Sequence, residues 1–182
     1  ILNTLAFAFF NCYDIDNSEK ILFESIKIKK TKEAFFLLGI IYFDKYDDKT
    51  EALNYYNRAL EFNPNDLENL TEKAWLLFEI GKVSEAENIF LKMLEIMQNK
   101  ETYNQVIHFY FTVRNYDKAF EYLNESKKNI GINYSNEGYE ILYFTLIKNN
   151  AIAQKLASYY KKKYSTFEIE WLKGVISEFG KV

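Results

Sequence analysis

Proline, cysteine and arginine are nearly absent from this chain. One proline and six glycines in 182 residues leave few of the turns that connect strands, so long helices are permitted. The single cysteine, Cys12, excludes an intramolecular disulfide and a cysteine-based zinc site. It fits a reducing compartment, and we expect a cytoplasmic protein. The chain starts at Ile1 rather than at methionine, which leaves an upstream signal, anchor or domain open.

Charge and hydropathy exclude two further classes. The formal net charge is -3 and the pI is near 5.4, so no strong positive field would attract a phosphate backbone. Arg58 and Arg114 are the only arginines, which argues against bidentate phosphate recognition. We therefore expect no nucleic-acid partner. No apolar run has the length needed to cross a bilayer, so we expect no membrane insertion within these residues.

Catalytic and metal-binding patterns are also missing from the sequence. His108 is the only histidine, so neither a histidine metal site nor a pair of nucleophile and base can be assembled around it. Glu68 and Glu72 stand one helical turn apart, a spacing that ordinary helix surfaces also show. There is no glycine-rich phosphate loop. We expect a protein that is not an enzyme and that holds no metal and no cofactor.

An alanine recurs near the start of successive amphipathic segments, at Ala52, Ala86, Ala119 and Ala153. Its spacing of 34, 33 and 34 residues is the period of a helix-turn-helix repeat. The pattern predicts eleven helices, near residues 1–12, 17–29, 32–44, 49–62, 67–80, 84–97, 101–114, 117–128, 136–148, 151–163 and 167–179. Because helices this short are unstable alone, they must stack. The predicted fold is an all-α solenoid, a right-handed α-α superhelix.

One stretch carries a more specific pattern. In order, it contains Phe35, Leu38-Gly39, Tyr42, Ala52, Tyr56, Ala59 and Pro64. This order resembles the tetratricopeptide-repeat family, with an aromatic, Leu-Gly and Tyr on a first helix and Ala, an aromatic and Pro on a second. The resemblance implies one solenoid domain over 1–182. Within it we expect a degenerate helical pair at 1–30, repeats at 32–65, 66–99, 100–132 and 134–165, and a closing helix at 166–182.

The resemblance implies that function lies on the concave surface, which is formed by the first helix of each pair. The expected groove residues are Phe36, Ile40 and Phe43, then Thr71, Trp75 and Phe78, then Asn104, His108 and Phe111. We expect Trp75 and Phe78 to be the most exposed. Acidic residues beside these aromatics favour a ligand that is both apolar and basic. Well-studied members bind the C-terminal carboxylate of a peptide with lysine, arginine and asparagine side chains in this groove. Of these residue types only Asn104 is expected here, which argues against carboxylate binding.

Three interpretations stay open at this point. The first is a non-catalytic protein-interaction scaffold that binds an extended segment or an amphipathic helix in its groove. In the second, the same aromatics are core residues, buried against each other or against the closing helix. The third is a structural or oligomerisation module that self-associates through apolar end helices. The end residues concerned are Phe7, Phe9 and Phe10, or Phe167, Trp171 and Phe179.

Overall fold

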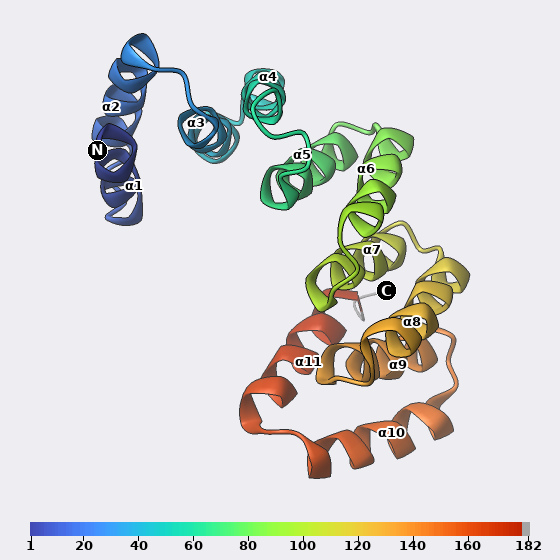
Figure 1. Cartoon of the computed structure of the whole chain (residues 1–182). Helices are drawn as coiled ribbons and strands as arrows, with labels where there is room; N and C mark the ends of the chain where they lie inside the picture. Colours follow the sequence, from blue (N-terminus) through green and yellow to red (C-terminus); the bar gives the residue numbers. More distant parts are fainter. Residues whose placement is uncertain (180–182) are drawn as a thin grey trace. The chain divides into compact units, whose positions relative to one another are not determined.

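The computed structural model describes residues 1–179, and in that range it contains eleven α-helices and no strand (Figure 1). The helices are α1 (Leu2–Asn11), α2 (Ile15–Ile28), α3 (Lys32–Asp44), α4 (Lys49–Leu60), α5 (Leu67–Glu79), α6 (Val83–Ile96), α7 (Lys100–Thr112), α8 (Tyr116–Ile130), α9 (Tyr134–Leu146), α10 (Asn150–Lys163) and α11 (Thr166–Phe179). The predicted all-α fold is confirmed, and each helix begins and ends within two residues of its expected bounds. Residues 180–182 of the expected closing helix lie outside the described residues.

Short polar side chains start most of these helices. Asp48 accepts a hydrogen bond from the Glu51 amide at 3.0 Å, which caps α4. At the start of α7, Asn99 and Thr102 cap each other's amides reciprocally. Helix α1 differs, because its N-cap residue, Ile1, offers no side-chain cap and its first turn has no acidic residue. The position of α1 therefore depends on contacts with other helices.

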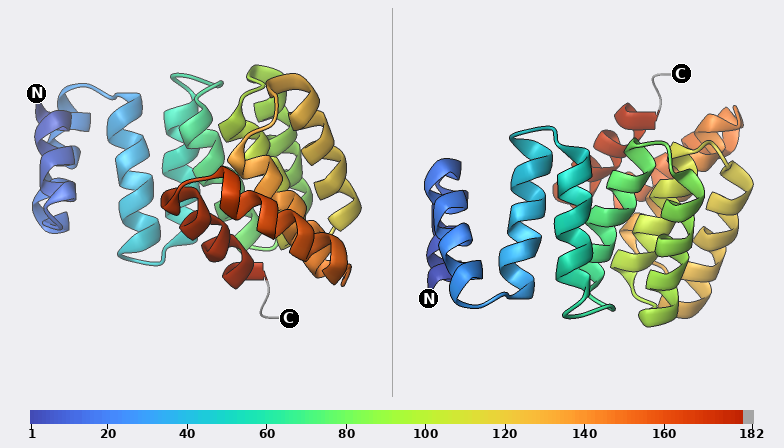
Figure 2. Two further views of the ribbon diagram at one scale, coloured as in Figure 1. Left: turned by 90° about the horizontal axis from the view of Figure 1, so that it is seen from below. Right: turned by 90° about the horizontal axis from the view of Figure 1, so that it is seen from above.

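The chain divides into two compact units, one comprising Ile1–Met93 and the other beginning at Leu94. Within the first unit, α1 packs against α2 and α3 packs against α4; within the second, α7 packs against α8 and α9 against α10 (Figure 2). The pairs α3/α4, α7/α8 and α9/α10 are those that the alanine period predicts, and α1/α2 is the pair expected at 1–30 without the repeat signature. The domain boundaries drawn from the repeats stay a prediction. No helix among residues 1–179 combines the length and the apolar character that a membrane crossing requires.

The recurring alanines are buried where paired helices cross. Ala52, Ala86 and Ala119 are fully buried, and Ala153 is nearly so. Small side chains at these positions let two helices approach closely, while aromatic side chains fill the wider gaps. In the first unit, the buried cluster includes Ala6, Leu22, Phe35, Leu38 and Ile41, contributed by α1, α2 and α3. This cluster fixes α1 and α3 beside each other.

One position of the repeat pattern is filled by an unusual residue. Lys73 on α5 stands where the family shows leucine, and it is partly buried. Burial lowers the pKa of its ammonium group, an effect that the nearby Glu85 charge opposes. The helix keeps its place because Leu70, Ala74 and Leu77 on the same element supply the buried apolar surface.

Candidate functional site

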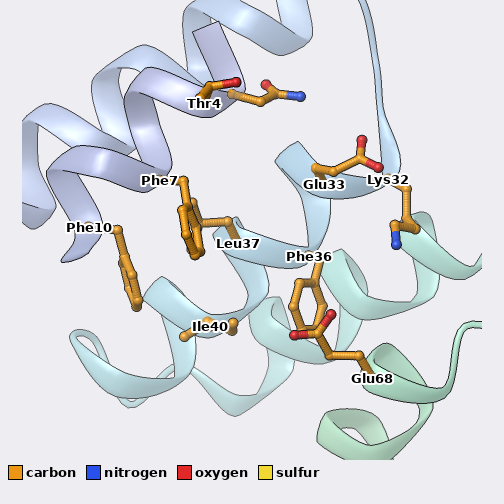
Figure 3. Close-up of a pocket in the computed structure, with 10 residues that line it drawn as sticks. Thr4, Phe7, Phe10, Lys32, Glu33, Phe36, Leu37, Ile40 and Glu68 are labelled. Carbon is orange, nitrogen blue, oxygen red and sulfur yellow. The ribbon is translucent and has the colours of Figure 1, made fainter. Parts of the chain in front are cut away.

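A cavity of about 450 Å³ lies in the first unit, where α1 and α3 run beside each other (Figure 3). This volume falls in the usual range for ligand-binding pockets, roughly 300–1,000 Å³. The lining residues are Asn3, Thr4, Phe7 and Phe10 from α1, Lys32, Glu33, Phe36, Leu37 and Ile40 from α3, and Glu68 from α5. We call this cavity the α1–α3 groove. Much of its wall is apolar, and its charged groups, Lys32, Glu33 and Glu68, lie away from Phe7 and Phe10, at what we call the polar end (Figure 3).

The apolar wall follows from helical spacing. Ile40 shares a side of α3 with Phe36, four residues before it, and with Leu37, three residues before it, because positions i, i+3 and i, i+4 are neighbours on a helix. On α1, Phe7 and Phe10 are three residues apart and also point into the groove (Figure 3). The Phe7 side chain is 55% exposed, so a large apolar surface is open to solvent there. Such a surface in a concave site favours an apolar ligand group.

Hydrogen bonds hold α1 in the position that forms the groove. The Asn3 amide donates to the Thr31 hydroxyl at 2.7 Å, and the Ser25 hydroxyl donates to the Asn3 carbonyl oxygen at 2.6 Å. Farther along, the buried Ser18 hydroxyl donates to the backbone carbonyl of Ala6 at 2.8 Å. These bonds join α1 to α2 and to the N-cap of α3. The groove is therefore built by the fold and does not depend on a ligand.

The polar end of the groove carries a net negative charge. Lys32 Nζ lies 2.7 Å from Asp66 Oδ2, and this hydrogen bond raises the pKa of Lys32. The lysine charge is thus balanced by a carboxylate outside the groove lining. Glu33 and Glu68 are exposed, and within the described residues neither side chain has a hydrogen bond or an ion pair. Two carboxylates are consequently available to a cationic ligand group.

The negative charge continues from the groove along α5. Burial raises the pKa of Glu72, and the charges of Asp44 and Glu68 raise it further. Burial also raises the pKa of Asp44, which ends α3. A carboxylate whose ionised form is disfavoured by burial and by like charges is stabilised when a cation approaches. The region between α3 and α5 therefore favours basic groups next to the apolar wall.

The structure brings only part of the predicted site together. Phe36 and Ile40 line the α1–α3 groove, and both also pack against the buried cluster of Ala52, Tyr56 and Leu76. Phe43 packs against this cluster too, but it does not line the groove.

The expected groove residues of α5 are largely occupied by contacts within the first unit. Thr71 donates its hydroxyl to the Leu67 carbonyl at 2.8 Å. Trp75 and Phe78, expected to be the most exposed, are both partly buried. The Trp75 ring meets Phe78 and Phe90 edge-on, with centroids 6.0 and 5.1 Å apart. These rings fill the space between α5 and α6.

In the second unit, the predicted groove residues meet the closing helix. Phe111 is 1% exposed and stacks on Tyr139, with ring centroids 5.7 Å apart. Both Phe111 and His108 contact the ring of Phe179, at the end of α11. Asn104 is partly buried. Phe111 is therefore a core residue, as the second of the three interpretations expects.

Sequence reasoning missed the half of the groove that α1 contributes. It considered Phe7 and Phe10 for self-association, because an apolar helix at the end of a solenoid lacks the polar cap that keeps such ends soluble. The available signal was their spacing of three residues, which places both rings on one helical face. Leu37 also lines the groove, although only its neighbour Phe36 was among the predicted groove residues.

Among residues 1–179, no group of three or more histidine, cysteine, aspartate or glutamate side chains is arranged to hold a metal ion. The acidic groups around the groove are spread along α3 and α5, and organic cations such as lysine and arginine side chains fit this spacing better than a compact ion.

Comparison with known proteins agrees with the fold. A tetratricopeptide-repeat family model matches residues 55–88, a span that runs from α4 into α6. The protein "Uncharacterized protein ycf37" of Pyropia yezoensis is 33% identical over 69 residues, which are 38% of this chain and 38% of that protein. The chain thus spans well under half the length of the relative it matches.

Two solved structures have similar folds. A tetratricopeptide repeat protein from Parabacteroides merdae has a TM-score of 0.72 at 18% identity, covering 96% of this chain and 69% of that one. PilW, described as a widely conserved type IV pilus biogenesis factor, has a TM-score of 0.72 at 15% identity, covering 94% of this chain and 79% of that one. At these identities the likeness concerns the fold.

Proposed function

We propose that this chain, a tetratricopeptide-repeat protein by its repeat sequence and its fold, is a non-catalytic scaffold that binds a protein segment in the α1–α3 groove. Folds of stacked helical pairs generally serve protein–protein interaction, because each added pair extends a binding surface. The ligand we propose is an apolar segment with basic residues. One observation carries this proposal: an apolar wall that includes the exposed Phe7 ring stands beside Glu33 and Glu68, whose side chains make no hydrogen bond or ion pair among residues 1–179.

The two parts of the groove contribute differently to binding. Apolar side chains of the ligand would lie between Phe7 and Phe10 on one side and Ile40 on the other (Figure 3). Burial of apolar surface supplies most of the affinity, at roughly 25 cal/mol per Å² before the costs of association. Glu33 and Glu68 would meet lysine or arginine side chains, which selects the partner and accelerates encounter more than it adds affinity.

A binding comparison with the full chain tests this function. The probes are synthetic peptides in which Leu, Phe or Met are combined with Lys or Arg. Ile40→Asp places a charge on the apolar wall, and we expect it to weaken binding at least about tenfold, or ~1.4 kcal/mol. The control is Ile28→Asp, because Ile28 on α2 is 78% exposed and does not line the groove. If both variants keep their helical content and bind the peptides as tightly as the unaltered chain, the peptides do not bind in the α1–α3 groove.

A second candidate function, self-association through α1, is favoured by a separate observation. Helix α1 has no charged residue and exposes Leu5 and Phe7. The corresponding proposal for the other end is weaker, because Trp171 and Phe179 contact the chain's own rings and Phe167 alone is largely exposed. Measuring the mass in solution over a range of concentrations decides this candidate. A constant monomer mass argues against it, and a Leu5→Lys variant that abolishes a dimer supports it.

A further inference from the structure

Helix α11 packs across the first helices of the two pairs in the second unit. Its Trp171 ring lies edge-on to Tyr134 and Tyr139 of α9, with centroids 5.4 and 5.5 Å apart. Its last residue, Phe179, reaches α7 and meets His108 and Phe111 at 5.0 and 5.8 Å. Figure 1 shows α11 beside α9, with its end near α7.

The surface under α11 includes residues that sequence reasoning assigned to a peptide-binding groove. We define the α7–α9 face by His108, Phe111, Gly138 and Tyr139. Gly138 leaves room for the indole ring, because a Cβ at this position would lie 2.6 Å from Trp171 Cζ3. A helix of the chain itself therefore rests where the resemblance placed a ligand.

The contact combines apolar anchors with one polar pair. Leu172 and Val175 are buried, and Trp171 and Phe179 extend the apolar side of α11 at both ends. Glu178 Oε1 lies 3.0 Å from His108 Nε2, and the Glu178 side chain is half exposed. The opposite side of α11, with Glu170, Lys173 and Ser177, faces solvent. This is the pattern of an amphipathic helix laid in a groove.

Helix α11 also starts independently of the face it covers. The Ser165 amide donates to Glu168 Oε2 at 2.8 Å, which caps the helix from within its own first turn. Two residues, Tyr164 and Ser165, separate it from α10. The start of α11 is also held by α10, because the Tyr160 hydroxyl donates to the Glu168 carbonyl at 3.2 Å, so local opening of α11 breaks this bond together with the contacts to the face.

We propose that the α7–α9 face is a second protein-binding surface and that α11 is its intramolecular occupant. The partner is an amphipathic helix with aromatic anchors eight residues apart, as Trp171 and Phe179 are, and a carboxylate placed like Glu178 to meet His108. Such a helix competes with α11 for the face. Its acidic character is opposite to that of the ligand proposed for the α1–α3 groove, so the two surfaces select different partners.

The test uses the full chain and a labelled peptide spanning Ser165–Phe179. In the unaltered chain the attached α11 competes at a high effective concentration, on the order of millimolar. We expect the peptide to bind the Trp171→Ala chain at least about tenfold more tightly than the unaltered chain. Tyr159→Ala is the matched control, because Tyr159 lies exposed on α10, and it should behave as the unaltered chain. Equal binding to all three chains, or no binding to any, overturns the proposal.

Two further measurements keep the result unambiguous. A peptide with Glu178→Lys should lose affinity for the Trp171→Ala chain, whereas Ile40→Asp in the chain should leave peptide binding unchanged. Hydrogen exchange of the unaltered chain covers the case in which Trp171→Ala does not fold. Amides of α11 should then exchange faster than those of α9, through local opening. Equal exchange in both helices shows that α11 opens only with the whole unit, and this contradicts the proposal.

Discussion

The ring of Tyr56 on α4 lies directly against the backbone of Gly39 on α3. A Cβ at position 39 would be 2.5 Å from Tyr56 Cε1 and 2.6 Å from Cδ1. The tyrosine is 1% exposed, so its ring cannot move into solvent to relieve the contact. The close approach of α3 and α4 therefore depends on a residue without a side chain, and α3 carries the wall of the α1–α3 groove.

We predict that Gly39→Ala destabilises the chain by roughly 1–3 kcal/mol, the usual cost of forcing extra atoms into a packed core. The matched substitution is Gly174→Ala on α11, where a Cβ would meet no atom within 4 Å. Because alanine favours helix more than glycine, this control should be neutral or stabilising by up to ~1 kcal/mol. Urea unfolding of both variants gives the comparison. A Gly39→Ala chain as stable as the control would show that α3 and α4 can separate without cost.

The stability of the second unit should depend on pH through His108. Burial lowers the pKa of its imidazole below the ordinary 6.5, although the Glu178 charge and hydrogen bond act in the other direction. The Tyr139 hydroxyl, 3.5 Å from Nδ1, also faces the ring. Because the pKa of His108 is lower in the folded chain, the unfolded chain binds a proton at this residue at a higher pH than the folded chain does. The contribution of neutral His108 to stability is therefore fully present above pH 6.5, and it is lost as the pH falls from there through the pKa of the folded chain.

His108→Gln should remove this part of the pH dependence. Thermal unfolding is measured from about pH 8 to about pH 5, the range in which histidine titrates. We expect the midpoint of the unaltered chain to fall more steeply below pH 6.5 than that of the variant. Parallel curves for the two chains would mean that His108 does not titrate differently on folding.

Glu72 should contribute to binding at the expense of stability. Its raised pKa, caused by burial and then by Asp44 and Glu68, means that its ionised form destabilises the folded chain at neutral pH. Glu72→Gln should stabilise the chain by roughly 0.5–2 kcal/mol at pH 7. The gain should vanish as the pH falls toward the ordinary glutamate value, because both states then bind the proton.

The same substitution should weaken the binding of basic peptides, because it removes a carboxylate next to the groove. Glu61→Gln, on the exposed residue that follows α4, is a control for the loss of one negative charge. Peptide affinity and urea unfolding are measured on both variants. A Glu72→Gln chain that binds as tightly as the control would assign Glu72 no part in recognition.

The fold could be predicted from the sequence because its determinants are local. The period of Ala52, Ala86, Ala119 and Ala153 reports the helix crossings, and Asn and Asp residues between the segments cap the helices. The assignment of Phe36 and Ile40 to a concave groove rested on the same local pattern, because α3 carries the clearest copy of the repeat, and that assignment stays a prediction.

The remaining site residues depend on contacts that no periodicity reports. Helix α1 lacks the repeat pattern, and the spacing of Phe7 and Phe10 places both rings on one helical face without indicating that this face meets α3. The burial of Phe111 results from Tyr139 and from Phe179, 68 positions later in the sequence. Trp75 is partly covered because Phe90 on the next helix meets it. Each outcome was set by packing between elements, which single-helix patterns do not encode.

Charge reversal at the polar end of the α1–α3 groove tests the central claim most directly. The affinities of one apolar and basic peptide, and of the same peptide with glutamate at its basic positions, are measured against the unaltered chain and against Glu33→Lys/Glu68→Lys. We expect the unaltered chain to prefer the basic peptide and the variant to prefer the acidic one, with both preferences reduced by added salt. If the two chains bind both peptides equally well, the groove does not select a basic segment and the proposed recognition is wrong.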